Sequence, residues 1–473
     1  MPSPSRSEAA GAGSPRADAH AARSLGAVDP GGSRQRGRRS AVALTADLVV
    51  VGTAAGDLRA FERAGGTAGD GTGADSLGPE RWRLAGDEPV VALAPFAGGA
   101  LAGTRGERGV IRLVAADGTE RWRLEAADDV GPPAKETRFW YPFVAAMETH
   151  GDRAYVAARR YERRSTDGDA DGGSDRRFES VVYALDPDGT VAWRYAARAS
   201  PVAIAADGDR VAVAYNRCPE PDAHDDGLVV LDPDSGDVRL RWDPRRAPDA
   251  GGDADASRPV GDVALTPDGH AVASHADYRG YLLDRDGAVH ASVDLGTPVE
   301  RRTGEGAEAD EGNAAGTDAE GGTTPDATER VYAYPNHVHA GAGGVAFVVG
   351  NTFPEEGRET AARHPAEHTA VGVDRSGEER WRADAGGFAH HVAGTADALA
   401  VPAAQHFRDR DPSVHGVRVF DLRTGEATVL GTEGVATAVA LDADAVAAVE
   451  EPVAYHDDDA GERGGCRLHR WPR

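Results

Sequence analysis

From about residue 40 onward, short apolar segments alternate with clusters of glycine, aspartate and proline. The segments are rich in Val, Ala and Leu, and almost none keeps the 3.6-residue period of an amphipathic helix. The spacing predicts strands joined by tight turns, as in "YALDPDGTVAW" from Tyr183 to Trp193. Aspartate and glycine suit these turns because a tight hairpin needs residues with positive φ. We therefore predict an all-β chain.

One string recurs along these turns: an aspartate, a turn that contains glycine, and a strand that carries a tryptophan or an aliphatic residue. It occurs at Tyr183 to Trp193, Gly372 to Trp381, Leu282 to Ala291, Val230 to Leu240 and Val419 to Val429. Because Ala291, Leu240 and Val429 replace the tryptophan, the position favours packing over catalysis.

Four antiparallel strands repeated every 40 to 60 residues are typical of a β-propeller blade. The innermost strands are expected near Ala41, Val90, Val144, Val202, Val263, Val338, Val392 and Ala436. These predict an eight-bladed ring over residues 38–473, with seven blades as the alternative. The last unit has only three strands before the chain ends, so a strand within Ala21 to Asp29 is the candidate that closes the ring. The rest of residues 1–37 is predicted to be disordered from its Ser, Gly, Ala, Pro and Arg content.

The repeated string resembles the PQQ-binding-like β-propeller repeat family. The matching positions are Ala184, Asp186, Gly189 and Trp193 in one unit, and Asp421, Thr424 and Gly425 in another. The family contains quinoprotein dehydrogenases and non-enzymatic outer-membrane assembly lipoproteins, and the resemblance implies that tryptophan docks one blade against the next. It also implies adjacent cysteines over the quinone in the dehydrogenases. This chain has no vicinal cysteine pair, which argues against PQQ as a cofactor and leaves no catalytic residue assigned.

The chain is strongly acidic, with 78 Asp and Glu against 52 Lys and Arg, a net charge of -26. This charge argues against nucleic acid and anionic membranes as partners. With almost no lysine, the composition resembles that of proteins from salt-in halophiles of the archaeal type, where carboxylates maintain solubility. Acidic loop insertions are expected near residues 165–178, 246–258 and 304–329.

The sequence suggests a cytoplasmic, monomeric ring. Its two cysteines, Cys218 and Cys466, give no disulfide framework or zinc-finger spacing. The sequence contains no run of 18 apolar residues, so it predicts no membrane-spanning helix. Arg38 and Arg39 precede an apolar segment, so twin-arginine export remains an alternative. Asp47 interrupts the apolar segment, and the segment has the strand-turn-strand form of the later repeats. An early core strand is therefore the competing interpretation of this stretch.

Two inner strands carry histidines where the others carry aliphatic residues. His337 and His339 are two positions apart, on one face of a strand, and His390 and His391 occupy the next inner strand. These four histidines could hold a transition metal, and hydrogen-bonded channel residues are the alternative.

A ligand pocket is a further hypothesis, with Arg138, Trp140, Tyr141 and Tyr334 as one rim, because aromatic and arginine side chains suit organic anions. A calcium loop from Asp167 to Glu179 is a weaker candidate, since Phe178 replaces the closing glutamate. The first functional hypothesis is therefore a non-catalytic platform for another protein or a ligand. The alternative is a metal-dependent or redox propeller enzyme with a histidine-lined channel.

Overall fold

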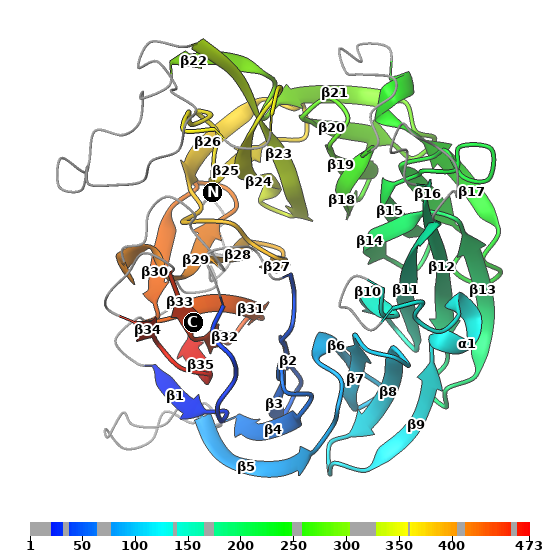
Figure 1. The fold of residues 1–473 in the computed structure, drawn as a ribbon, viewed down its shortest axis with the longest axis vertical. Coiled ribbons are helices and arrows are strands. Elements are labelled where there is room, and N and C mark those ends of the chain that lie inside the picture. The colour runs from blue at the N-terminus through cyan, green and yellow to red at the C-terminus, as the bar shows by residue number, and fades with distance from the viewer. Residues whose placement is uncertain are drawn as a thin grey trace, which may run out of the picture.

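The computed structural model describes residues 20–31, 37–63, 77–135, 140–164, 175–247, 258–302, 328–357, 360–403, 412–455 and 461–473. Eight antiparallel sheets surround a central axis and form a closed ring (Figure 1). The prediction of an all-β, eight-bladed propeller is confirmed, and the seven-bladed alternative is wrong.

In the first five blades the chain runs from the innermost to the outermost strand in sequence order. Blade 1 contains β2 (Ala41–Leu44), β3 (Leu48–Gly52), β4 (Leu58–Arg63) and β5 (Leu77–Leu84). Blade 2 contains β6 (Val90–Phe96), β7 (Gly99–Thr104), β8 (Val110–Ala115) and β9 (Glu120–Glu125). Blade 3 contains β10 (Phe143–His150), β11 (Arg153–Arg164), β12 (Asp175–Leu185) and β13 (Val191–Ala197). Blade 4 contains β14 (Ser200–Ala206), β15 (Val211–Arg217), β16 (Leu228–Leu231) and β17 (Val238–Trp242). Blade 5 contains β18 (Val260–Thr266), β19 (Gly269–Ser274), β20 (Arg279–Asp284) and β21 (Val289–Asp294).

Blade 6 has an additional strand, β22 (Val299–Arg302), which pairs with the start of the long strand β23 (Thr328–Gly341). It continues with β24 (Gly344–Pro354), β25 (Thr369–Val373) and β26 (Glu379–Asp384). Blade 7 contains β27 (Ala393–Gly394), β28 (Ala398–Ala403), β29 (Gly416–Asp421) and β30 (Ala427–Gly431). Helical structure in the described residues is limited to α1 (Ala127–Val130) and two short 3-10 turns, Pro244–Arg246 and Pro412–Val414.

Blade 8 joins the two ends of the described chain. It contains β31 (Val435–Leu441), β32 (Ala445–Glu451), β35 (Arg467–Pro472) and β1 (Ala21–Ser24), beside a small hairpin of β33 (Val453–Ala454) and β34 (Glu462–Arg463). The outermost strand, β1, pairs antiparallel with β35 and lies in the segment expected to hold the closing strand. Residues 1–19 and 32–36, and most of the three predicted acidic insertions, lie outside the described residues.

The hydrophobic core lies between neighbouring blades, and the recurring tryptophans form part of it. Trp193 of blade 3 donates a hydrogen bond from Nε1 to the Pro233 carbonyl of blade 4, at 2.9 Å. A Cβ atom on Gly236, in that same turn, would come within 2.7 Å of the Trp193 ring, so the turn needs glycine for its φ of 74° and for close approach.

The same contact recurs around the ring. The other tryptophans that donate to a carbonyl of the next blade are Trp82 to Ala116, Trp122 to Pro187 and Trp381 to Leu422, at 3.0, 3.0 and 2.9 Å. Leu240 and Ala291 take the place of the tryptophan against the turn glycines Gly287 and Gly377. The repeated string therefore encodes the docking of blades.

Candidate functional site

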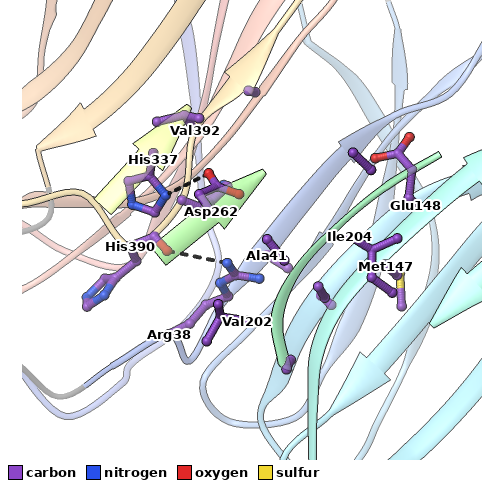
Figure 2. A pocket seen from close by; sticks show the side chains of 18 of the residues that line it. Arg38, Ala41, Met147, Glu148, Val202, Ile204, Asp262, His337, His390 and Val392 are labelled. Carbon is purple, nitrogen blue, oxygen red and sulfur yellow. Dashed lines mark hydrogen bonds and ion pairs between the residues drawn. The ribbon is translucent and has the colours of Figure 1, made fainter. Parts of the chain in front are cut away.

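A central channel of about 960 Å³ is lined by the innermost strands. Many of the lining residues are small or branched apolar ones from the inner strands, and polar side chains and backbone groups complete the wall. Polar groups gather where the inner strands begin, and that end is called the channel mouth below. Figure 2 shows His337, His390, Asp262 and Arg38 on one side of the channel, and Met147 and Glu148 across from them.

His337 and His339 connect blade 6 to blade 7. The Nε2 atom of His337 lies 3.0 Å from the carbonyl oxygen of Ala389, and that of His339 lies 2.8 Å from the carbonyl oxygen of Thr395. A carbonyl only accepts, so both Nε2 atoms donate. The other ring nitrogen of His337, Nδ1, lies 3.5 Å from the carboxylate of Asp262 (Figure 2).

The second pair, His390 and His391, is held in neutral form. Burial and then the positive charge of Arg38 lower the pKa of His390 to about 3. Burial likewise places the pKa of His391 well below its usual value, and its Nε2 lies 3.1 Å from both the amide nitrogen and the carbonyl oxygen of Val439. Arg38 donates to the carbonyl oxygens of Val91 and His390, at 3.4 and 3.3 Å.

His337 and His339 lie on β23, whereas His390 and His391 precede the short inner strand β27 instead of lying on it, because regular pairing in blade 7 begins only at Ala393. All four line the channel. Within the described part of the chain, no group of three or more His, Cys, Asp or Glu side chains is arranged to hold a metal ion. Metal binding by these histidines stays a prediction.

The proposed aromatic rim is divided between two places. Trp140 of the segment before blade 3 packs on Tyr161 at 5.2 Å, whereas Tyr334 of blade 6 packs on His275 at 4.6 Å. Trp140, Tyr141 and Tyr334 are not part of the channel wall. Arg138 lies outside the described residues.

Tyr334 belongs to a cluster that we call the tyrosine rim, formed by Tyr278, Tyr332, Tyr334 and Phe353. Ring centroids are 4.5 Å apart for Tyr278 and Tyr332, 5.2 Å for Tyr332 and Tyr334, and 5.5 Å for Tyr334 and Phe353. All four rings are half-buried, and most of the cluster lies on the extended halves of β23 and β24.

A second feature, which no single stretch of the sequence indicates, is the arginine arc, which consists of Arg38, Arg105, Arg159, Arg217 and Arg258. These residues come from blades 1 to 5 in order. Arg105 directly follows β7, while Arg159 and Arg217 lie in β11 and β15 opposite Phe143 and Ser200, the first residues of their inner strands. Arg38 and Arg258 precede the inner strands of blades 1 and 5. All five therefore lie at the mouth end of the ring.

Burial weakens the protonated state of several members of the arc. It lowers the pKa of Arg159 to about 10. Burial, followed by the charges of Arg258, Arg176 and Arg159, also lowers the pKa of Arg217 to about 10. These arginines remain positively charged near neutral pH, and the mouth is a cationic region in an acidic protein.

The opposite end of the channel contains a carboxyl group in an apolar setting. Glu148 lies at the end of β10, and Figure 2 shows it near Met147 and Ile204. Burial raises the pKa of Glu148 to about 7. Apolar walls disfavour the carboxylate form, so this group changes charge near neutral pH.

The cysteines do not fit the quinone site that the resemblance implies. Cys218 and Cys466 are buried in blades 4 and 8, and burial raises the pKa of each thiol to about 12. The calcium-loop candidate falls largely on residues 165–174, outside the described residues, and Phe178 is a buried ring in β12. Among the described residues, no helix is long and apolar enough to cross a membrane.

A sequence model of the PQQ-like repeat, described as "Outer membrane protein assembly factor BamB", matches residues 72–268. This match supports the interpretation as a PQQ-like propeller. No curated protein matches the chain.

Among solved structures, BamB from Moraxella catarrhalis is 14% identical, with 96% of this chain and 100% of that chain covered and a TM-score of 0.48. Sqt1 from Saccharomyces cerevisiae is 9% identical, with 94% and 98% covered and a TM-score of 0.47. The Pan2 WD40 domain from Neurospora crassa is 11% identical, with 95% of each chain covered and a TM-score of 0.39.

Proposed function

We propose that this protein is a non-catalytic propeller that holds a protein partner against the edge of blades 5 and 6. The observation that carries the proposal is the tyrosine rim. Aromatic residues make up only 6% of the chain, yet four rings contact one another there. Arg258 adds a guanidinium 5.3 Å from the Tyr334 ring.

Tyrosine and arginine are the residue types that contribute most to binding energy at protein interfaces. A half-buried tyrosine offers a large apolar face together with a hydroxyl, and it loses little side-chain entropy on binding because it has only two side-chain torsions. The strands of blade 6 hold the rim in place before a partner arrives, which favours binding by a preformed surface.

The positions of Arg38 and Arg39 support a cytoplasmic location over twin-arginine export within this proposal. Arg38 lies at the channel mouth and Arg39 forms a 2.5 Å ion pair with Glu451, so both are structural parts of the ring. The acidic composition supports a host with a high intracellular salt concentration.

The proposal is tested by chemical cross-linking and co-purification of the full-length chain from its native host. The double variant Tyr332→Ser, Tyr334→Ser should lose a specific partner, because loss of two central interface rings typically costs more than about 2 kcal/mol, or about 30-fold in affinity. Tyr195→Ser is the matched control, since Tyr195 is a half-buried tyrosine on the outer strand of blade 3. Equal recovery of the partner by both variants would exclude the tyrosine rim as the binding surface.

A further inference from the structure

The tyrosine rim borders two arginines that have no carboxylate partner. Arg217 is the last residue of β15 in blade 4, and Arg258 lies two residues before β18 in blade 5. Both side chains are half-buried, and neither forms an ion pair with a carboxylate among the described residues. Neither belongs to the channel wall. They therefore form a pair of charges beside the rim, outside the channel.

The carboxylates of this part of blade 4 are engaged by other arginines. Glu220 lies 3.6 Å from Arg177 and 3.2 Å from Arg198. Two further carboxylates of the loop after β15 are also paired, in the contacts Asp225–Arg245, Asp225–Arg246 and Asp226–Arg241, at 2.8, 3.1 and 2.9 Å. Acidic side chains are thus present nearby, and they leave Arg217 and Arg258 uncompensated.

The positive charge of Arg258 acts on the groups around it. Burial is the largest cause that lowers the pKa of Arg217 to about 10, and the charge of Arg258 is the next. The same two causes, in the same order, lower the pKa of His275 to about 3. His275 is therefore neutral near neutral pH, while both arginines stay charged. Two like charges in partly buried positions repel each other, and a negative group placed between them removes this repulsion.

The rim has a fixed shape beside these charges. Arg258 lies against the Tyr334 ring, as described above, and the ring of Tyr278 lies 4.5 Å from that of Tyr332 and 5.6 Å from that of Tyr334. Tyr278 has a φ of 63°, which residues other than glycine rarely adopt, and its carbonyl oxygen accepts the Gly296 amide at 3.0 Å. Strained residues of this kind concentrate at binding sites. The rings and the arginine pair form one contiguous surface over blades 4, 5 and 6.

We propose that the partner bound at the tyrosine rim presents an acidic segment, whose carboxylates pair with Arg217 and Arg258 while its apolar side chains pack on Tyr332 and Tyr334. The inference rests on the proposed function and specifies the chemistry of the partner. Guanidinium groups bind carboxylates through paired N–H donors in a planar fork, and such charge-assisted bonds are stronger than neutral ones.

The net charge of the protein does not oppose this contact at close range. A charge of -26 repels an acidic partner at a distance, but salt screens this repulsion beyond about 10 Å at 0.1 M. Partly buried ion pairs are screened much less. The two uncompensated arginines therefore decide the sign of the interaction at the surface where the partner docks.

The experiment measures the binding of two short fluorescein-labelled peptides to the full-length protein by fluorescence anisotropy, at a constant KCl concentration. One peptide alternates aspartate with leucine, and the other has asparagine in place of each aspartate. We expect the wild type to bind the aspartate peptide about tenfold more tightly than the asparagine peptide. The double variant Arg217→Gln, Arg258→Gln should lose this preference. Arg239→Gln, a change at an exposed arginine paired with Asp232, should keep it.

A further variant separates the charge from a packing role. Arg258→Lys retains the positive charge without the planar fork, so it should keep part of the preference that Arg258→Gln loses. The melting temperature shows whether each variant is folded. If Arg217→Gln fails to fold, the two Arg258 variants provide the same comparison, because Arg258 lies outside the strands.

The outcomes distinguish the acidic segment from the rim itself. Equal binding of the two peptides by the wild type, binding of neither peptide, or a preference that survives in the double arginine variant would overturn the proposal. Tyr332→Ser, Tyr334→Ser should weaken the binding of both peptides, since both contain the leucines. If the wild type binds the peptides equally and the tyrosine variant loses both, the rim is the binding surface and only the acidic chemistry is wrong. Unchanged binding of both peptides by the tyrosine variant would exclude the rim and, with it, the proposed function.

Discussion

Replacing Trp193 with alanine should destabilise the contact between blades 3 and 4. The Trp193 side chain is only 7% exposed, and it packs with Tyr155 at a centroid distance of 5.9 Å. Its indole N–H is bonded to the Pro233 carbonyl of the next blade. The change therefore leaves a cavity between the blades and removes a hydrogen bond that joins them.

The expected loss can be worked from these contacts. Burial of a large aromatic side chain and the cavity left after its removal together correspond to about 3–5 kcal/mol in the free energy of unfolding. Trp193→Phe keeps most of the packing but leaves the Pro233 carbonyl without its donor, which costs about 1–2 kcal/mol. The order of stability should be wild type, then Trp193→Phe, then Trp193→Ala.

The outer strand of blade 7 offers a control. Val429 has the offset of the tryptophan in the sequence, but in the structure it pairs with Arg418 and is 49% exposed, while Thr428 takes the equivalent place opposite Val419. Val429→Ala should therefore change stability by less than about 0.5 kcal/mol. Unfolding by guanidinium chloride at fixed salt should be followed by far-UV circular dichroism, because tryptophan fluorescence itself changes in the variants. If Trp193→Ala and Val429→Ala have the same midpoint, the tryptophan does not stabilise the docking of blades.

Two further predictions concern the channel. Glu148→Gln should raise the melting temperature at pH 8 and have no effect near pH 4. The pKa of Glu148 is raised to about 7 in the folded state, so ionisation of this buried group opposes folding. The wild type therefore loses up to about 3 kcal/mol of stability as the pH rises from 4.5 through 7. A Glu148→Gln variant that is less stable than the wild type at pH 8 would contradict this reasoning. The double variant His337→Ala, His339→Ala should lose about 2 kcal/mol, because it removes two hydrogen bonds to blade 7. Elemental analysis of protein purified without chelators should show the same metal content in the wild type and in the double variant, with the exposed His150→Ala as the control. One transition metal per chain in the wild type that is lost in the double variant would support the metal-dependent alternative instead.

The fold was predictable because its signals are local and repeated. Each tight turn places an aspartate and a glycine between two short apolar strands, and the tryptophan or aliphatic residue that follows recurs at the same offset. The number of blades followed from counting the innermost strands. The predicted aromatic rim of a ligand pocket matches the structure only in part. Tyr334 belongs to an aromatic cluster, but Trp140 lies three blades away from it. A linear sequence pattern does not show how far apart two blades are around the ring. The alternation of Tyr332 and Tyr334 placed both on one face of a strand, and this signal was available.

The arginine arc could not be recognised from any single repeat, because each blade supplies only one of its members. In a propeller, equivalent positions of successive blades lie side by side around the axis, so charges separated by 40 to 60 residues in sequence act together at one end of the channel. Aligning the units on the start of the second strand, rather than on the turn, would have placed Arg105, Arg159 and Arg217 in one column. The net charge of -26 describes the molecule as a whole and does not set the sign of the potential at the mouth, since arginines held in a low-dielectric wall act over a few ångströms with little screening.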